Sequence, residues 1–327
     1  MSVRAPVGPI NFSTEKICIG RGLAAIRASD LIDKNFLFNF LLKHEAEIVG
    51  NTGAVFDSIS KSQIESILIP IPPIQEQQLI VAILDQAFEG IAKARANAQQ
   101  NLKNARALFE SHLQSVFTQR GEGWVEKKLG EVCDLVNGFA FKSSDVVETS
   151  HTQLVRMGNL YGNTLSLDRS PVFYPDAFAQ IHRNYLLVKD DLIMSLTGTT
   201  GKEDYGYTVK IPNCNHALLM NQRIVKFEIL NTKLINRNFL MHYLRSRVFL
   251  DKLYLTANGT RQANLSSVVI KTLPIPVCSI ENQQSVAGTL DAISEETQGL
   301  EALYQRKITL LDELKKSLLQ QAFAGEL

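Results

Sequence analysis

The amino-acid sequence predicts an α+β protein, with one compact α/β domain that carries a curved sheet and two long helices that pair with each other. Three observations support this fold class. A block of sequence occurs twice; each copy ends in a long proline-free stretch with heptad spacing; and the residues between the copies alternate short β-rich runs with turn signals.

The internal repeat is the strongest of these signals. Residues 59–121 match residues 265–327 without a gap at a constant shift of 206, and a three-residue gap extends the match upstream to Leu31 and Leu234. The stretch from about residue 124 to 220 has no counterpart, because too few residues precede Leu31 to hold one. The chain is therefore expected to be a two-copy protein that lacks the front of copy one.

Each copy opens with a short apolar run rich in proline, at residues 67–73 and 272–277. Proline removes a backbone donor and opposes helix, so we expect edge or connecting segments here. Long helices are predicted to follow, from about residue 75 to 117 and from 281 to 323. Their apolar residues recur with the heptad spacing of a coiled-coil seam: Leu84, Ile91, Ala98 and Ala105 in the first, and Leu290, Thr297, Tyr304, Leu311 and Leu318 in the second.

Further apolar residues are expected to complete this seam, namely Ala87, Ala94, Leu108, Ile293, Leu300 and Leu314. A seam of this kind also suits contact with another molecule. In the unique middle, β-rich runs are expected at residues 132–136, 154–157, 185–188, 192–196 and 223–227. Residues 236–250 have the pattern of one amphipathic helix.

Composition excludes some functions. The 34 basic and 33 acidic residues nearly cancel, so a nucleic-acid role must rest on local features. The four cysteines form no CxxC pair, and Cys214 near His216 has no second pair of ligands, so neither a metal nor a cofactor is expected. We see no signal segment or apolar run long enough to span a bilayer, and expect a cytoplasmic protein.

Four stretches carry a resemblance to a known family. They are WVEKKLGEVCDLVNGFAF from Trp124, LVRMGNL from Leu154, LLVKDDLIMSLTGTTG from Leu186, and the IPIPP-IQEQQ type of sequence before each long helix. In this order, and together with the repeat, they resemble the specificity subunit of type I restriction-modification systems. That family has two target recognition domains, each followed by a long conserved helix, and the two helices are antiparallel.

The resemblance implies a division of the chain into four parts. Residues 1–72 would be the remnant of a first recognition domain, 73–121 the first conserved helix, 122–277 a complete recognition domain, and 278–327 the second helix. It also implies double-stranded DNA and modification subunits as partners, with the restriction subunit joining through the latter. Because only one recognition domain is complete, we expect a half-site reader, to which a homodimer would add a second.

A helix of 40 residues is about 60 Å long, close to two turns of DNA at about 34 Å each. The helix pair is therefore expected to set the distance between half-sites. DNA bases are read by arginine, lysine and amide side chains on exposed loops. Four loop clusters of the complete domain offer such residues, and from them we select Asn137, Lys142, Arg156, Asn159, Thr199, Lys202, Asn258, Arg261, Gln262 and Asn264 as candidate DNA contacts.

The last cluster, NGTRQAN from Asn258, concentrates these residue types beside Gly259, although Asn-Gly alone also suits a tight turn. The corresponding stretch of copy one reads NTGAVFDS and lacks both Arg261 and Gln262. GTTGK at residues 198–202 is not a phosphate loop, because Leu196 and Glu203 stand where that motif needs glycine and Ser or Thr.

No set of nucleophile, base and metal ligands can be assembled, so we expect no enzyme activity in this chain; the family places methylation and cleavage in partner subunits. Two other hypotheses remain open. One is a coiled-coil interaction protein or inactive fragment, suggested by the apolar run at residues 36–42, whose packing partner would be missing. The other is an enzyme that acts on DNA by itself.

Overall fold

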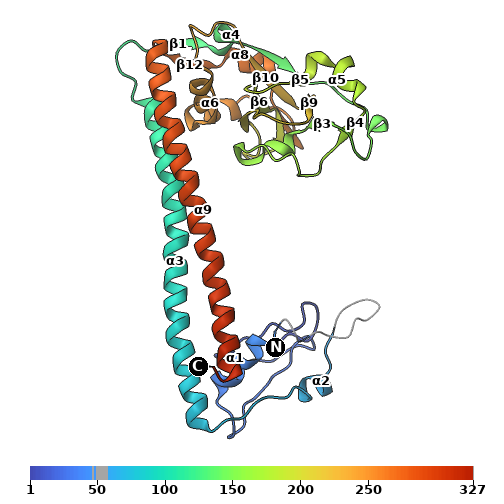
Figure 1. Ribbon diagram of the computed structural model, residues 1–327, viewed down its shortest axis with the longest axis vertical. Helices are drawn as coiled ribbons and strands as arrows, with labels where there is room; N and C mark the ends of the chain where they lie inside the picture. The colour runs from blue at the N-terminus through green and yellow to red at the C-terminus, as the bar shows by residue number, and fades with distance from the viewer. Residues whose placement is uncertain (46–47, 49–57, 327) are drawn as a thin grey trace. The chain divides into compact units, whose positions relative to one another are not determined.

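The computed structural model describes residues 1–45, 48 and 58–326 and divides into two compact units (Figure 1). Unit 1 comprises Met1–Asn104 and Leu300–Leu327, and unit 2 comprises Ala105–Gly299. Both long helices, α3 (Ile74–Thr118) and α9 (Ile280–Ala324), contribute to both units. The described residues include no helix long and apolar enough to cross a membrane.

Unit 1 contains the short helices α1 (Lys34–Lys43) and α2 (Lys61–Glu65), the first part of α3 and the last part of α9. Leu84 shares a buried cluster with Leu319, Lys315 Nζ lies 4.9 Å from the centre of the Phe88 ring, and Arg95 Nε donates to Asp312 Oδ1 at 3.0 Å. Residue numbers rise along α3 as they fall along α9. The two segments in this unit are therefore antiparallel, as Figure 1 shows.

The expected seam residues are buried or half-buried. Leu84, Ile91, Ala98, Ala105 and Leu290 are buried, and Tyr304, Leu311 and Leu318 are half-buried. The expected second line of the seam is wrong in part, because Leu108, Leu300 and Leu314 are exposed. On α3, half-buried residues lie both three residues after the seam positions, at Ala87 and Ala94 as expected, and four residues after them, at Phe88, Arg95 and Leu102.

The apolar run at residues 36–42 does not lack a packing partner. Phe36, Leu37, Phe40 and Leu41 are buried, and the rings of Phe36 and Phe40 lie 5.0 and 5.5 Å from that of Phe323 at the end of α9. Asp33 caps α1 by accepting hydrogen bonds from the N–H groups of Asn35 and Phe36. The expectation of a missing partner is therefore corrected.

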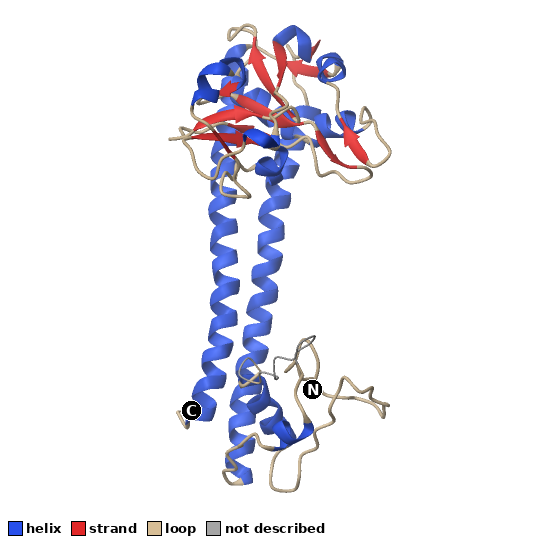
Figure 2. Cartoon of the chain, turned by 90° about the vertical axis from the view of Figure 1, so that its right-hand side faces the viewer, coloured by secondary structure: helices blue, strands red, loops and turns tan. Residues whose placement is uncertain are grey.

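Unit 2 holds every strand of two or more residues in the described structure, as the red arrows of Figure 2 show. Its elements, apart from the long helices, are β1 (Val125–Lys128), α4 (Leu129–Val132), β2 (Cys133–Asn137), η1 (Ser143–Asp145), β3 (Thr152–Val155), η2 (Met157–Asn163), β4 (Phe173–Tyr174), α5 (Ala177–Ile181), η3 (Arg183–Tyr185), β5 (Leu186–Leu187), β6 (Leu192–Ser195), β7 (Thr197–Thr199), β8 (Thr208–Lys210), β9 (Ala217–Met220), β10 (Ile224–Ile229), α6 (Arg237–Arg245), α7 (Arg247–Tyr254), β11 (Gln262–Asn264), α8 (Ser267–Thr272) and β12 (Pro274–Val277).

Two four-stranded sheets form the body of unit 2. One has the order β2-β10-β6-β8 and is antiparallel throughout; the other has the order β4-β3-β9-β5, in which β3 and β9 are parallel. Two small sheets, β1-β12 and β11-β7, are antiparallel. The predicted α+β class, with one mixed domain and two paired long helices, is confirmed.

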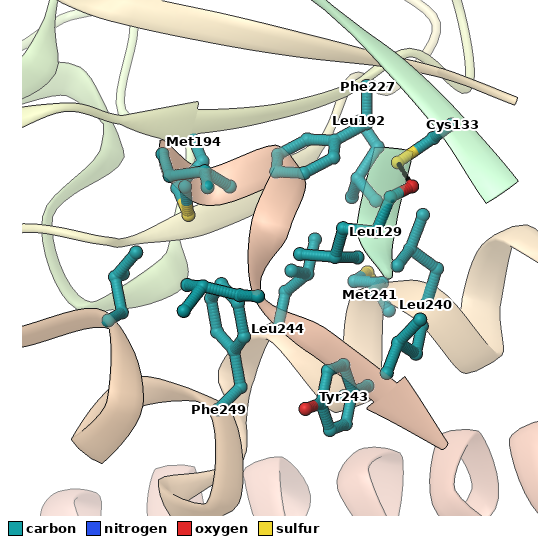
Figure 3. Close-up of a cluster of buried hydrophobic side chains, with 14 of the residues drawn as sticks. Leu129, Cys133, Leu192, Met194, Phe227, Leu240, Met241, Tyr243, Leu244 and Phe249 are labelled. Atoms are coloured by element: carbon teal, nitrogen blue, oxygen red, sulfur yellow. Dashed lines mark hydrogen bonds between the residues drawn. The ribbon is translucent and has the colours of Figure 1, made fainter. Parts of the chain in front are cut away.

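The main core of unit 2 lies between the β2-β10-β6-β8 sheet and helices α6 and α7 (Figure 3). Leu192, Met194 and Phe227 from the sheet share a buried cluster with Tyr243 and Phe249 from the helices. The single helix expected over residues 236–250 is broken at Ser246, whose extended backbone begins a second helix. The Ser246 hydroxyl donates to the Tyr243 carbonyl at 2.7 Å, so it satisfies a helix-end acceptor.

The repeat is also present in the hydrogen bonds of two buried glutamines. In unit 1, Gln77 Oε1 accepts from Asp33 N at 2.8 Å, and Gln77 Nε2 donates to the carbonyls of Leu31 and Pro72. In unit 2, Gln283 makes the equivalent three bonds with Asn236 N and the carbonyls of Leu234 and Cys278. Each glutamine thus joins the start of a long helix to the start of the short helix beside it.

Replacing either glutamine by alanine should destabilise its unit. Gln283→Ala leaves one buried donor and two acceptors without a partner, for an expected cost of about 1–3 kcal/mol. Gln77→Ala should cost a similar amount in unit 1. The adjacent Gln78 and Gln284 are exposed, so Gln78→Ala and Gln284→Ala are matched controls. Urea unfolding measures the losses, and equal losses for Gln283→Ala and Gln284→Ala would contradict the assigned role.

Candidate nucleic-acid interface

Strand ends of both large sheets meet at one edge of unit 2. Asn137 at the end of β2 is paired with Val225, and Ser195 at the end of β6 is paired with Ile224 at the start of β10. The parallel strands β3 and β9 end together, at Val155 and Met220. The turn at residues 221–223 connects β9 to β10, so loops that are far apart in sequence are neighbours at this strand-end edge.

Three arginines line a cavity of about 550 Å³ at the strand-end edge. Arg156 follows β3, Arg169 lies in the loop between η2 and β4, and Arg223 precedes β10. Asn221 and Gln222 also line this cavity. Arg156 Nη2 donates to the Ser170 carbonyl at 2.5 Å, and the Arg169 guanidinium lies 5.3 Å from the centre of the Tyr161 ring. The Arg223 side chain is exposed and has no hydrogen-bond or ion-pair partner among the described residues.

The small β7-β11 sheet adjoins this cavity. The Thr197 hydroxyl on β7 contacts the sulfur of Met157, which lines the cavity, at 2.8 Å. Thr199 at the end of β7 is paired with Gln262 at the start of β11. Two clusters that the sequence presented separately, around Thr199 and around Gln262, are therefore joined by one strand pair.

Loops beyond this strand pair line a second cavity, of about 310 Å³, whose walls include Thr200, Lys202, Asn258 and Gly259. Glu203 is bound by Arg247 through two hydrogen bonds, at 2.7 and 3.2 Å. Burial alone would raise the pKa of Asp204, but hydrogen bonds from the Thr199 hydroxyl and N–H lower it. The exposed Lys202 forms no side-chain hydrogen bond or ion pair among the described residues, and its charge also contributes to lowering the pKa of Asp204.

The NGTRQAN segment forms a tight turn and also presents an arginine. Asn258 and Asn264 exchange two backbone hydrogen bonds, at 3.0 and 2.8 Å. Gly259 has a φ of +121°, and a Cβ there would lie 2.0 Å from the Gln262 carbonyl oxygen. Within the described part of the chain, the exposed Arg261 guanidinium has no partner. The turn and the binding interpretation are therefore compatible at this segment.

Two candidates do not fit the edge as expected. Asn159 is buried, its Oδ1 accepts from Arg156 N, and its Nδ2 donates to the carbonyls of Ser166 and Arg169. Its amide is used inside the loop, so we reassign Asn159 to positioning this loop. Lys142 lies beside β4, where its carbonyl accepts from the Tyr174 hydroxyl at 3.1 Å; β4 pairs with the start of β3 and not with its end.

Sequence reasoning missed Arg169, Asn221, Gln222 and Arg223. A signal was present for the last three, because the polar NQR triplet lies between two apolar runs, ALLM and IVKF. Such a triplet is typical of an exposed turn between buried strands. Asn137 is exposed as expected, and its Nδ2 donates to the Ser267 hydroxyl at 3.0 Å.

The described residues contain no group of three or more His, Cys, Asp or Glu side chains that could hold a metal ion. Cys214 Sγ is 3.5 Å from the Pro212 carbonyl, and the His216 ring lies near those of His151 and Phe173. The chemistry that the strand-end edge offers is that of guanidinium, ammonium, amide and hydroxyl donors. These groups suit phosphates and base edges.

Sequence comparisons find relatives over most of the chain. The putative type I restriction enzyme MjaX specificity subunit of Methanocaldococcus jannaschii is 39% identical over 109 residues, which is 32% of this chain and 25% of that protein. The MjaVIII specificity subunit of the same organism is 25% identical over 317 residues, 91% of this chain and 71% of that protein. The EcoBI specificity subunit of Escherichia coli is 24% identical over 225 residues, 68% of this chain and 43% of that protein.

Solved structures share the fold. A chain from a study of complex assembly and conformational transition in a type I R-M system aligns with a TM-score of 0.73 and 20% identity, over 92% of this chain and 74% of that chain. The HsdS subunit of Thermoanaerobacter tengcongensis aligns with a TM-score of 0.54 and 19% identity, over 91% and 72%. The family model for the type I restriction modification DNA specificity domain matches residues 1–103 and 121–310. The chain therefore belongs to the type I restriction-modification DNA specificity domain family.

Proposed function

We propose that the chain is the non-catalytic, DNA-reading component of a type I restriction-modification assembly, and that unit 2 reads one half-site through its strand-end edge. This role places the protein in the cytoplasm with its DNA. The single observation that carries the proposal is the convergence of Asn137, Arg156, Thr199, Arg223 and Gln262 at one edge, from five separate parts of the sequence.

The free arginines support this proposal more than the net charge does. Arg223 and Arg261 are exposed and have no partner among the described residues, so binding DNA would break no existing ion pair. A forked guanidinium suits guanine or a phosphate. The nearby carboxylates of Glu203 and Asp204 are already engaged, which reduces their repulsion of phosphates.

Selection from a random duplex pool tests the proposal directly. The purified chain, alone and with the modification subunits of its own system, is expected to enrich duplexes that share one short sequence element. A chain that binds no duplex better than random DNA in either state would exclude the DNA-reading role. In that case the interaction-protein hypothesis, which the family assignment does not favour, would become the better one.

Substitution of the free arginines separates base reading from phosphate binding. Arg223→Ala and Arg261→Ala should each weaken binding to the selected duplex by roughly 10–100-fold, and binding to random DNA much less. Lys189→Ala is the control, because Lys189 is an exposed basic residue of unit 2 that lies between the end of β5 and the start of β6, at the strand ends opposite the edge. Competition titrations over a range of salt measure both affinities. Equal losses of affinity for the selected duplex and for random DNA would show that these arginines contact phosphates and do not read bases.

Modification subunits are proposed to dock on the long helices. Leu303, Leu310 and Leu314 are 59%, 51% and 47% exposed on α9, on a face that the seam with α3 does not use. Heptad-spaced leucines on an open helix face are typical of helix-to-helix contact. Leu310→Asp should reduce copurification of the modification subunit without changing DNA selection, and unchanged copurification would place the docking surface elsewhere.

A further inference from the structure

The loop between β3 and β4 carries two of the cavity arginines, Arg156 and Arg169, so its placement on unit 2 decides where they lie. Leu160 is buried in a cluster with Val209 and Ile211, which anchors the loop by apolar contact. Apolar contacts are non-directional and do not fix the orientation of a loop by themselves. The hydrogen bonds that leave the loop therefore determine its orientation.

Asn163 is a residue of this loop that is bonded to two other elements. Its Oδ1 accepts from Thr208 N on β8 at 2.8 Å, and its carbonyl accepts from Arg245 Nη2 on α6 at 3.2 Å. Gly162 and Asn163 both have a left-handed backbone, with φ of 65° and 60°. Asparagine adopts this conformation more readily than most other residues with a Cβ. The two bonds therefore hold a backbone conformation that most side chains disfavour.

Arg245 bonds to both sides of this contact. Its Nε donates to the Thr208 carbonyl at 2.9 Å, while its Nη2 donates to that of Asn163. Burial lowers the pKa of the Arg245 guanidinium to about 10, and the charge of Asp291 opposes this shift, so the group remains charged at neutral pH. A charged donor makes strong hydrogen bonds, and the planar guanidinium fixes the angle between them. One side chain thus holds the Asn163 and Thr208 carbonyls in a fixed geometry.

Other residues on the same face of α6 fix the helix that carries Arg245. Asn238 and His242 precede it by seven and three residues, a spacing that places all three side chains on one helix face. Asn238 Nδ2 donates to Asp291 Oδ2 at 2.7 Å, and His242 Nε2 lies 2.7 Å from Asp291 Oδ1. Lys210 Nζ on β8 donates to Asn238 Oδ1 at 3.0 Å. The helix that carries Arg245 is therefore bonded to both α9 and β8.

Two tyrosines connect these hydrogen bonds to the cavity. Tyr161 lies two residues before Asn163, Tyr207 lies directly before Thr208, and the two rings are 5.1 Å apart. The guanidinium of Arg169, which lines the cavity, lies 5.3 Å from the centre of the Tyr161 ring. Separation of Asn163 from Thr208 would therefore move Tyr161 relative to Tyr207, and with it the ring on which Arg169 rests.

We propose that Arg245 is a positioning residue for DNA reading, which acts through Asn163 and Tyr161 to hold Arg169 in place for contact with DNA. Arg245 and Asn163 are themselves not among the residues that line the cavity. This role depends on the DNA-reading function proposed above for unit 2. It adds that the affinity for the selected duplex is set in part by a half-buried residue outside the cavity.

Arg245→Met tests this role, because methionine keeps much of the length of the side chain and removes its hydrogen bonds. Binding to the selected duplex should weaken roughly tenfold, and binding to random DNA much less. In the free chain, exchange mass spectrometry should show faster hydrogen exchange at the start of β8, where Thr208 N donates to Asn163. Arg237→Met is the matched control, since Arg237 is half-buried on the same helix and makes no side-chain hydrogen bond or ion pair within the described part of the chain.

Double-mutant cycles separate the positioning of Arg169 from a general loss of stability. Arg169→Ala alone should weaken binding to the selected duplex by a factor similar to that of Arg245→Met. In the Arg169→Ala background, Arg245→Met should then cost no more than about twofold, because no guanidinium is left to position. In an Arg261→Ala background it should still cost roughly tenfold, since Arg261 lies on a different loop. A merely structural effect would give the same loss in both backgrounds.

Asn163→Gly is a milder second variant, because glycine keeps the left-handed backbone and the carbonyl and loses the acceptor for Thr208 N. It should remain folded by tryptophan fluorescence and bind the selected duplex roughly threefold more weakly, again only while Arg169 is present. If Arg245→Met does not fold, Asn163→Gly decides the outcome. Equal losses in the two backgrounds, or unchanged affinity for a duplex that the wild-type chain selects, would overturn the role of Arg245 alone. A wild-type chain that selects no duplex would overturn the DNA-reading function, and the positioning role with it.

Discussion

Phe117→Ala is expected to lower the free energy of unfolding of unit 2 by about 3–5 kcal/mol, because it leaves a cavity in the core. The Phe117 side chain is fully buried near the end of α3, and its ring lies 5.3 Å from that of Phe239 and 5.2 Å from that of Tyr243. Both partners lie on α6, so this one side chain joins a long helix to the main core of unit 2. Leu108→Ala, at a residue of α3 that is 69% exposed, is the matched control.

Trp124 makes the measurement specific to unit 2. It is the sole tryptophan of the chain, and its ring packs against that of Phe239. Denaturation followed by tryptophan fluorescence should therefore show the loss in Phe117→Ala and little change in Leu108→Ala. Phe323→Ala, at the repeat counterpart in unit 1, should mainly speed hydrogen exchange in α1. A fluorescence transition that moves as far with Phe323→Ala as with Phe117→Ala would contradict two separate clusters.

The repeat predicted from sequence corresponds to repeated contacts in three dimensions. Gln77 and Gln283 make equivalent hydrogen bonds, and Phe323 packs on Phe36 and Phe40 as Phe117 packs on Phe239 and Tyr243. These pairs could be found from sequence because the repeat, with its one three-residue gap, includes both the long-helix residues and their partners on the short helix. The repeat also shows where the copies differ in burial: Ile71 is 57% exposed, whereas its counterpart Val277 is 2% exposed.

The features that could not be predicted from the sequence depend on packing between residues far apart in the chain. The break at Ser246 interrupts an apolar pattern that continues on both sides, so periodicity alone does not locate it. Thr199 and Gln262 are paired across more than 60 residues of sequence, and the β7-β11 register that joins them is set by tertiary contacts. Arg223 stood out only as part of the NQR triplet, and the parallel register of β3 with β9, which end together at Val155 and Met220, places it beside Arg156.

Gly138→Ala is expected to disrupt the strand-end edge. A Cβ at this position would lie 2.1 Å from the Asn221 carbonyl oxygen and 2.6 Å from that of Met220, which are both backbone atoms. Backbone cannot rotate away as the end of a flexible side chain can, so the turn at residues 221–223 must shift. That turn carries Gln222 and Arg223, and the shift would move both relative to Arg156. We expect at least about a tenfold loss of affinity for the selected duplex, equivalent to about 1.4 kcal/mol.

Gly158→Ala provides the matched control for this effect. Gly158 lines the same cavity, but a Cβ there would meet no heavy atom within 4 Å. This variant should keep its affinity for the selected duplex within about twofold, which is well under 1 kcal/mol. Competition titration against random DNA separates loss of reading from loss of folding, and tryptophan fluorescence confirms that unit 2 is intact. If Gly138→Ala remains folded and still selects the same duplex, the position of Arg223 beside Arg156 does not determine which DNA is read.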